Sequence, residues 1–507
     1  MSEAKRFFKS GILLTLVGLA MRTAAMLFGA FISRTVGAEG TGLYTLVMTV
    51  YSFAVTLATS GISLTVTRLV ASVIGEGRPN EVGRVLRGAF IYSFFFGLLA
   101  TLGLFFGADL LGDYILSDSR TASSLRVLSL SLIPAALSSV FSGYFVGVKR
   151  VSFNAAATVF CQLVKMLLTV ALVAYLAPYG TVSAVIGLCI GITLTELLGF
   201  LLILIEFLYD RHKNGAKPKK KSPDLSSVAK TALPLAFSAY VRSLLLNIEH
   251  ILIPQKLRES GESREEAYAN YGTLHGMALP LVTYPMSPLS SFAGLLVPEL
   301  AEDMAAAKTG RMSRIASKAF NATLSYALIC AVFLFFFAEE LGYLVYDSYD
   351  AGYYISTLAL VVPIMYLDHV TDSMLKGIGE QVFSMWVNIS DSLLSVILVW
   401  LLIPRMGIMG YAVVIVLMEG YNFLLSFFRL RRRISFKIKT MSAVLPLTAA
   451  IFAALLTKQL FSFGGSCAPT LWLILKMLFA IAITVFILAV FNLSAQKTSL
   501  NKNTAPD

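Results

Sequence analysis

Hydrophobic residues along this chain gather into long stretches that are separated by short polar segments. A membrane-spanning helix needs about 20 consecutive, mostly apolar residues, and fourteen stretches reach that size. The pattern predicts an all-α integral membrane protein with fourteen transmembrane helices. The predicted spans cover residues 10–33, 42–70, 86–110, 123–147, 152–177, 182–208, 228–254, 271–298, 316–340, 352–376, 382–403, 408–429, 441–462 and 470–493.

Composition agrees with this class. Of the 507 residues, 57% are hydrophobic and 14% are charged, and the mean hydropathy is +0.76. A soluble protein could not cover so much apolar surface with so few charges. The first stretch is too long for a cleaved signal peptide and carries Arg22 at its centre, so we expect it to remain as an anchor.

The net charge of +12 follows from topology. With both termini in the cytoplasm, 29 of the 41 Lys and Arg residues fall on the cytoplasmic side and 8 on the external side. This bias follows the positive-inside rule and predicts a multi-pass protein of the cell membrane with both ends cytoplasmic. We expect the cluster 217–221 to lie against anionic membrane lipids, so no nucleic-acid partner is needed.

A basic linker at 210–225 divides the chain into two related halves. Pro134 corresponds to Pro363, and Gly147 to Gly377. A longer match has a constant offset of 223. It aligns Gly187, Leu194, Glu196, Phe200, Leu201 and Leu202 with Gly410, Leu417, Glu419, Phe423, Leu424 and Leu425.

The repeat predicts two pseudo-symmetric six-helix lobes, the N-terminal lobe at 1–209 and the C-terminal lobe at 226–435. Six spans per lobe make the repeats parallel, as in transporters that work by alternating access. Residues 436–495 hold helices 13 and 14, which lie outside the repeat, and 496–507 form a cytoplasmic tail.

Two arginines lie where the bilayer makes charge costly. Arg22 is central in the first span and Arg242 in the seventh. A charge at that depth costs at least about 2.5–3.5 kcal/mol, so it normally faces a cavity or a partner. Guanidinium groups bind phosphate oxygens in pairs. We therefore predict that Arg22 and Arg242 bind an anionic or diphosphate headgroup. The alternative is structural ion pairing, for example between Arg242 and Glu249.

Glu196 and Glu419 form a second pair related by the repeat, deep in helices 6 and 12. Substrate binding and a polar clamp within each lobe are equally compatible with their positions.

The C-terminal lobe carries extra polar residues inside its spans. Asn247 and Glu249 lie on helix 7, while Asn388 and Asp391 share one face of helix 11. Carboxylate and amide oxygens suit a monovalent cation or a transported proton, so these four residues are candidates for cation coupling by Na⁺ or H⁺. Asp368, Asp372 and Lys376 on helix 10 are interpreted as a stripe that neutralises itself.

Other chemistry is weakly indicated. The four cysteines have no paired spacing, and no metal site or further cofactor is expected. No phosphate-binding loop for a nucleotide is present in the sequence. External loops are short, so a membrane glycosyltransferase or polymerase is disfavoured and the chain is predicted not to be an enzyme.

Two runs resemble a known family. Residues 36–44 (Val-Gly-Ala-Glu-Gly-Thr-Gly-Leu-Tyr) and 271–280 (Tyr-Gly-Thr-Leu-His-Gly-Met-Ala-Leu-Pro), with Val297-Pro-Glu-Leu-Ala301, are similar to the stage V sporulation protein B branch of polysaccharide exporters. That branch shares a superfamily with multidrug extruders and lipid II flippases. The resemblance covers essentially the whole chain.

The resemblance implies a flippase that moves an undecaprenyl-diphosphate-linked sugar, such as a peptidoglycan precursor, from the inner to the outer leaflet. It implies that Arg22 faces the cavity, that Asn388, Asp391 and Glu249 form a sodium site, and that helices 13 and 14 hold the lipid tail. The flippases' second arginine of helix 1, the aspartate that Gly42 replaces, and an arginine of helix 2 have no counterparts. Lipid II is thus not singled out as the cargo.

We expect a monomer whose partners are the lipid-linked saccharide and membrane lipids. The alternative is a multidrug/toxin cation antiporter of the same superfamily. Such an extruder would prefer an acidic cavity, and Arg22 and Arg242 disfavour it.

Overall fold

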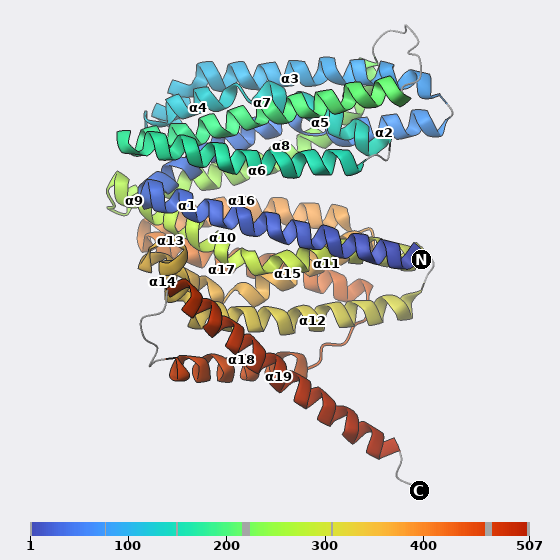
Figure 1. The fold of residues 1–507 in the computed structure, drawn as a ribbon, viewed down its shortest axis with the longest axis vertical. Helices are drawn as coiled ribbons and strands as arrows, with labels where there is room; N and C mark the ends of the chain where they lie inside the picture. Colours follow the sequence, from blue (N-terminus) through green and yellow to red (C-terminus); the bar gives the residue numbers. More distant parts are fainter. Residues whose placement is uncertain are drawn as a thin grey trace. The chain divides into compact units, whose positions relative to one another are not determined.

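The computed structural model describes residues 3–76, 78–148, 151–214, 224–305, 308–461 and 469–503. Every regular element in these ranges is helical (Figure 1). The α-helices are α1 (Glu3–Thr59), α2 (Ile62–Gly75), α3 (Val82–Leu110), α4 (Thr121–Ser129), α5 (Leu132–Gly147), α6 (Val151–Leu176), α7 (Thr181–Asn214), α8 (Leu225–Glu259), α9 (Arg264–Tyr271), α10 (Leu279–Thr283), α11 (Ser287–Ala305), α12 (Thr309–Phe336), α13 (Ala338–Tyr346), α14 (Tyr349–Ala359), α15 (Val362–Gly377), α16 (Gln381–Met406), α17 (Ile408–Arg433), α18 (Met441–Leu460) and α19 (Pro469–Asn503). Shorter turns are η1 (Pro79–Glu81), η2 (Leu111–Ile115), η3 (Ala177–Tyr179), η4 (Gly272–Ala278) and η5 (Tyr284–Met286).

The prediction of an all-helical membrane protein is confirmed. Among the described residues, nine helices are long and apolar enough to span a bilayer, or up to eleven when two bent pairs each count as one span. The fourteen separate spans therefore stay a prediction. One cause is α1, which runs through the polar segment between the first two predicted spans and breaks locally at Gly37 (φ 75°). Separately, α19 continues to Asn503, beyond the predicted end of its span.

Packing divides the chain into two compact units. The N-terminal unit comprises Phe31–Gly272 and Ser392–Tyr411, and the C-terminal unit comprises Met1–Ala30, Thr273–Asp391 and Ala412–Asp507. These units differ from a simple division at the linker, because α8 packs on α2 and α3 of the N-terminal unit. The described part of the linker is short, and residues 215–223, with the cluster 217–221, lie outside the described residues. The predicted lobe boundaries stay a prediction.

Each unit contains a helix pair that bends at a matched place. In the N-terminal unit α4 and α5 meet at 40°, and in the C-terminal unit α14 and α15 meet at 59°. The second helix of each pair carries Pro134 or Pro363 in its first turn, where proline is tolerated because that amide needs no helical partner. The proline match of the sequence repeat is therefore a shared helix break.

Gly147 and Gly377 also serve the same purpose in the two units. A Cβ on Gly147 would lie 3.1 Å from the carbonyl oxygen of Thr67 on α2, and one on Gly377 would lie 3.0 Å from that of Val297 on α11. A side chain at either position would force the neighbouring helix to shift by a few tenths of an ångström. Since α2 and α11 follow the first spans of their halves, the repeat preserves contacts as well as residue types.

The two runs that carry the family resemblance meet inside the N-terminal unit. A Cβ on Gly42 of α1 would lie 2.0 Å from the carbonyl oxygen of Tyr268 on α9, and one on Gly272 would lie 2.6 Å from the amide nitrogen of Gly42. The runs are therefore glycine-containing because α1 and the end of α9 cross backbone to backbone.

The proline-rich stretch predicted as span 8 is broken into η4, α10, η5 and α11. Tyrosine hydroxyls of the C-terminal unit bind carbonyls at this break. Tyr366 donates to the carbonyl of Val282 at 2.8 Å, and Tyr326 to that of Pro285 at 2.7 Å. Because exposed carbonyls are costly in hydrocarbon, these tyrosines make the broken helix tolerable.

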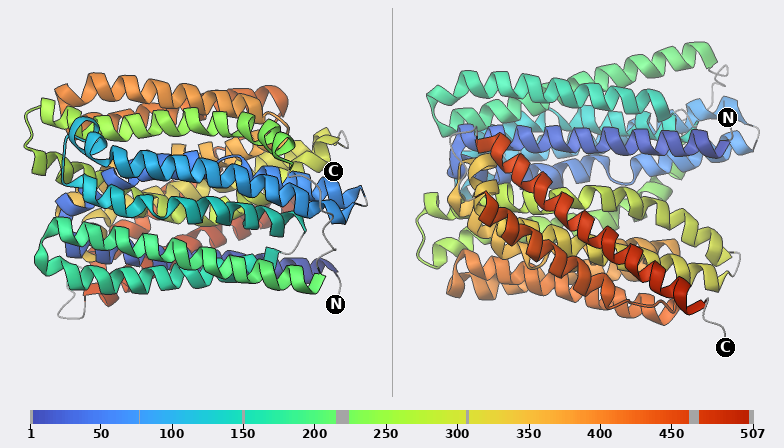
Figure 2. Two further views of the ribbon diagram at one scale, coloured as in Figure 1. Left: turned by 90° about the horizontal axis from the view of Figure 1, so that it is seen from above. Right: turned by 60° about the horizontal axis from the view of Figure 1, so that its bottom comes forward.

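The apolar interior of the C-terminal unit extends to the last two helices. Val332 and Phe333 of α12 pack with Ala450 of α18 and with Leu473 and Ala480 of α19. Figure 2 (right) shows α18 and α19, in red, running side by side. The helices outside the repeat thus form part of one unit.

We predict that Tyr366→Phe lowers the thermal stability of the purified protein by the equivalent of about 1–3 kcal/mol, because the carbonyl of Val282 loses its partner in a buried site. Thermal unfolding in mild detergent, followed by intrinsic fluorescence, measures the change. Tyr346→Phe is the control, since Tyr346 is also buried but donates no hydrogen bond to a break. Equal unfolding temperatures for the two variants would refute this role.

Candidate functional site

Four carboxylates from three successive spans gather in the C-terminal unit. Asp368 of α15 lies close enough to Asp372, one turn along the same helix, and to Asp391 of α16 to interact with both electrostatically. Glu419 of α17 interacts in the same way with Asp368 and Asp391. We call Asp368, Asp372, Asp391 and Glu419 the carboxylate cluster.

Hydrogen bonds and one cation only partly compensate the carboxylate cluster. Ser426 donates to Asp368, Ser384 donates to Asp372, and the ammonium of Lys376 lies 2.5 Å from Asp372. Carboxylates in a low-dielectric region repel each other strongly. Binding of a proton would relieve this repulsion.

The interpretation of Asp368, Asp372 and Lys376, which lie on α15, as a stripe that neutralises itself holds for half of it. Lys376 pairs with Asp372, while Asp368 faces Asp391 and Glu419. Sequence reasoning therefore missed Asp368 as a site residue. The signal was its position one helical turn before Asp372, but its neighbours on α16 and α17 come from tertiary packing.

The proposed coupling residues fall into two separate units. In the C-terminal unit Asp391 joins the carboxylate cluster, and the side-chain amide of Asn388 donates to the carbonyl of Ser384 at 2.8 Å. In the N-terminal unit Asn247 and Glu249 are buried, with 7% and 8% of their surfaces exposed. A single site formed by all four stays a prediction. Among the described residues, no group of three or more His, Cys, Asp or Glu side chains could hold a metal ion.

Glu249 lies in a tyrosine-rich environment within the N-terminal unit. It interacts electrostatically with the buried Tyr271 and Tyr411, and the ring of His250 lies 6.4 Å from that of Tyr271. The amide of Asn247 donates to the carbonyl of Ser243 at 2.5 Å. These polar side chains lie together in an apolar helix bundle and come from α8, α9 and α17.

The two predicted phosphate-binding arginines differ in how far the structure describes them. The backbone of Arg22 belongs to α1, but its side chain lies outside the described residues. Arg242 is exposed on α8, between Tyr240, which donates to the carbonyl of Leu57, and Ser243, which donates to Thr56. No ion pair joins Arg242 to a described carboxylate, so the alternative of a structural pair with Glu249 gains no support.

The repeat-related glutamates have different surroundings. Glu196 lies near Lys165 of α6 and Tyr51 of α1, all in the N-terminal unit. Glu419 lies among carboxylates. The clamp interpretation therefore fits Glu196 better, and the substrate or ion interpretation fits Glu419 better.

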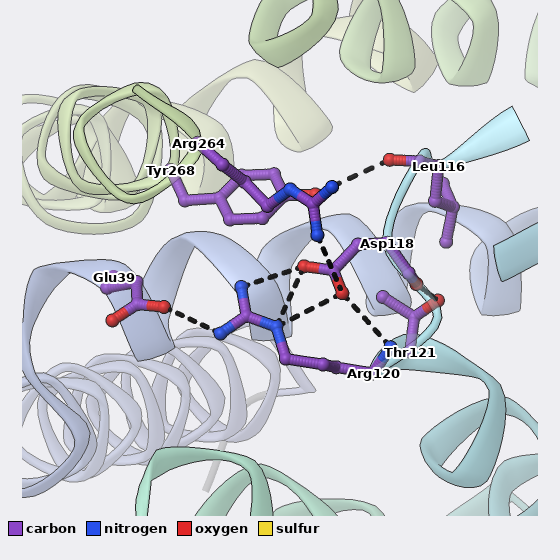
Figure 3. Close-up of polar contacts among 7 residues, drawn as sticks. All are labelled: Glu39, Leu116, Asp118, Arg120, Thr121, Arg264 and Tyr268. Carbon is purple, nitrogen blue, oxygen red and sulfur yellow. Dashed lines mark hydrogen bonds and ion pairs between the residues drawn. The ribbon is translucent and has the colours of Figure 1, made fainter. Parts of the chain in front are cut away.

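A second ionic cluster in the N-terminal unit joins Asp118, Arg120 and Arg264, which lie outside the candidate spans, to Glu39 of α1 (Figure 3). The buried carboxylate of Asp118 receives hydrogen bonds from the Nε and Nη2 atoms of Arg120 at 3.0 and 2.8 Å. Arg264 of α9 lies 3.9 Å from Asp118, and Arg120 also donates to Glu39 of α1 at 2.9 Å. Hydrogen bonding to Asp118 raises the pKa of Arg120 above its ordinary value.

This ionic cluster joins three segments of the N-terminal unit. Tyr268 of α9 adds a hydrogen bond to the carbonyl of Leu116 at 3.4 Å, close to the crossing of Gly42 and Gly272. The short helix α9 begins with a capping box between Ser263 and Glu266, which fixes its first turn. We interpret the cluster as structural, since every charge in it has a partner.

Comparison with known proteins places this geometry in context. The family described as "Polysaccharide biosynthesis protein" matches residues 7–304, and the family described as "MatE" matches residues 275–401. The chain is 27% identical over 505 residues to "Stage V sporulation protein B" of Bacillus subtilis (strain 168), covering 96% of both chains. It is 22% identical to "Sporulation protein YkvU" of the same organism, covering 70% of this chain and 78% of that one.

Solved structures share the fold at low identity. "Lipid II flippase MurJ, inward closed conformation" superposes with a TM-score of 0.73 at 13% identity, covering 96% of this chain and 99% of that one. An inward-facing multidrug resistance transporter of the MATE family superposes with a TM-score of 0.66 at 17% identity, covering 83% of this chain and 98% of that one. The resemblance inferred from the short sequence runs is confirmed.

For the ionic cluster we predict that Asp118→Asn lowers stability by about 2 kcal/mol. The substitution removes the buried negative charge that Arg120 and Arg264 face, and this loss costs more stability than the loss of an exposed ion pair. The partial exposure of Arg120 and its remaining bond to Glu39 reduce the cost. Thermal unfolding of the purified variant checks the value. Asp109→Asn is the control, because Asp109 pairs with Arg126 at an exposed site, and a loss of similar size there would contradict the assignment.

Proposed function

The chain belongs to the polysaccharide biosynthesis protein family, and on that premise we propose that it is a flippase for an undecaprenyl-diphosphate-linked saccharide. It carries the lipid from the inner to the outer leaflet of the cell membrane by alternating access, with both termini in the cytoplasm. The observation that carries the proposal is the likeness to stage V sporulation protein B over nearly the full length of both chains. The fold shared with the lipid II flippase supports it.

The chain has features suited to moving a charged, hydroxyl-rich headgroup across the apolar bilayer. A saccharide diphosphate cannot cross hydrocarbon, because its charges and hydroxyls would lose their hydration. Arg242, which lacks a carboxylate partner among the described residues, supplies a guanidinium suited to phosphate oxygens. Arg22 on α1 is proposed as its counterpart. The polyprenyl tail remains in lipid, and exposed apolar residues of α18 and α19, such as Phe452 and Phe486, offer it a surface.

The carboxylate cluster supports coupling to a cation or to the membrane potential. A proton or Na⁺ that enters the cluster changes its net charge, and helices α15, α16 and α17 would respond because each contributes a carboxylate. Glu249 and Asn247 of the N-terminal unit are proposed as further residues for cation coupling. No further cofactor is invoked, and the protein is proposed to act as a monomer without catalysing a covalent reaction.

A multidrug cation antiporter is the second candidate. The match of residues 275–401 to the MatE family favours it, and so does the carboxylate cluster, since carboxylates attract cationic drugs. Arg242 disfavours it, as does the extent of the family match at 7–304. Lipid binding separates the two candidates.

We predict that the protein purified in mild detergent retains undecaprenyl-diphosphate saccharide in native mass spectra, and that Arg242→Ala lowers retention at least about tenfold. Loss of a charge-assisted pair of hydrogen bonds to phosphate costs about 1.5–3 kcal/mol. Arg405→Ala is a control at another exposed arginine. Full lipid flipping by an Arg22→Ala, Arg242→Ala double variant, or binding of cationic drugs in place of the lipid, would overturn the proposal.

For coupling we predict that Glu419→Gln reduces the dependence of flipping on an imposed cation gradient, because it removes one charge from the carboxylate cluster. Proteoliposomes with a fluorescent undecaprenyl-diphosphate saccharide, quenched from outside by dithionite, provide the rate with and without the gradient. Glu196→Gln is the matched variant, since Glu196 occupies the corresponding position beside Lys165. If both variants keep the full gradient response, the cluster does not couple transport.

A further inference from the structure

The connector between α17 and α18 is an extended segment held against α12. Residues 435–439 have no regular hydrogen-bonded structure of their own. Four polar residues at every fourth position of α12 bind the connector and the first turn of α18 in succession, and this spacing places them on one face of the helix. They are Ser313, Ser317, Asn321 and Ser325.

The contacts fix the connector backbone residue by residue. Ser313 donates to the carbonyl of Ser435. The amide of Lys437 donates to Ser317 at 3.0 Å, and Asn321 both donates to the carbonyl of Lys437 and accepts from the amide of Lys439, each at 2.8 Å. Ser325 donates to the carbonyl of Ser442 at 2.8 Å.

Apolar side chains hold the same segment from beneath. Ile434 and Phe436 are each 4% exposed. The ring of Phe436 lies 5.3 Å from that of Phe320 on α12 and 5.9 Å from that of Phe427 on α17. Side chains of an extended segment alternate in direction, so burying Phe436 turns its neighbours Lys437 and Ser435 outward.

The outward face of the connector is cationic and unneutralised. Lys437 and Lys439 are exposed. The carboxylate of Glu380 pairs with Arg429 and Arg433 instead. Further exposed cations lie on the adjoining turns of α12 and α17, and in the described part of the chain none of this group forms an ion pair. The group comprises Arg314, Lys318, Arg431, Arg432, Lys437 and Lys439.

The connector also carries exposed apolar residues. Ile438 is 41% exposed, Met441 64% and Val444 49%. Since the connector joins two membrane spans, Ile408–Arg433 and Met441–Leu460, it lies where the chain leaves and re-enters the bilayer. Cations beside exposed apolar groups at that depth match the phosphate headgroups and upper acyl chains of membrane lipids.

We propose that this surface is a binding site for anionic phospholipid headgroups of the leaflet that it faces, with Lys437 and Lys439 as the principal contacts. Ser317 and Asn321 of α12 hold the backbone of the two lysines in a fixed arrangement, so little backbone conformational entropy is lost when a headgroup binds. The site is separate from the flipped lipid and from the carboxylate cluster, and it stands or falls independently of the proposed function.

The test is competition between phospholipids for the full-length purified protein. The protein is incubated with equimolar dioleoyl-phosphatidylglycerol and dioleoyl-phosphatidylcholine, and bound lipids are counted by native mass spectrometry. We expect the unsubstituted protein to prefer phosphatidylglycerol. Lys437→Gln, Lys439→Gln should reduce the preference about fivefold for each cation removed.

Two further variants keep the test decisive. Arg405→Gln, Lys458→Gln removes the same charge from exposed residues elsewhere and should leave the preference intact. Asn321→Ala keeps every cation but releases the connector, and it should weaken the preference. An unchanged preference in the Lys437, Lys439 variant, or an equal fall in the control, would overturn the site. Displacement of the lipid by inorganic phosphate would reject a phospholipid as the occupant.

Discussion

A bilayer offers no water to satisfy backbone amides and carbonyls, and the architecture of this protein depends on that constraint. It requires helices throughout the apolar interior, and every regular element in the described ranges is one. Where a helix is interrupted, side chains replace the missing partners. Tyr326 and Tyr366 do so at the broken helix of the C-terminal unit. Ser131, which binds the carbonyl of Leu128 and the hydroxyl of Tyr51, does so between α4 and α5.

The same constraint explains what could be predicted from the sequence. Hydropathy identifies apolar stretches, so the membrane class and most helices follow directly. It cannot tell whether a polar segment between them is a loop or continuing helix. Residues 34–41 look like a loop, but most of them are helical. Two helical stretches of α1 meet at a kink at Gly37, and Thr35 and Thr41 on either side donate to carbonyls four residues back. The matched prolines were recognised only as part of the repeat, and the structure shows that each lies at a bend.

The candidate site was harder to predict because its chemistry depends on neighbours. Spacing placed Asp368, Asp372 and Lys376 on one face of a helix. Only the packing of α16 and α17 shows that Asp372 pairs with the lysine while Asp368 lies near other carboxylates. The duplicated glutamates make the same point. Glu196 and Glu419 occupy equivalent positions, but Lys165 accompanies the first and carboxylates accompany the second. Duplication preserved the glycine and proline contacts of the backbone while the charge on the two halves diverged.

The polar stripe of α12 has a mechanical consequence for the end of the chain. Its residues hold the connector at Ser435, Lys437 and Lys439. They thereby restrict the movement of α18 relative to α17 that a flexible connector would allow. Together with the apolar packing of α12, α18 and α19, the stripe fixes the last two helices rigidly to the C-terminal unit. Any displacement of that unit must therefore also move both helices through the surrounding lipid. The rate of such a displacement then depends on the viscosity and thickness of the bilayer.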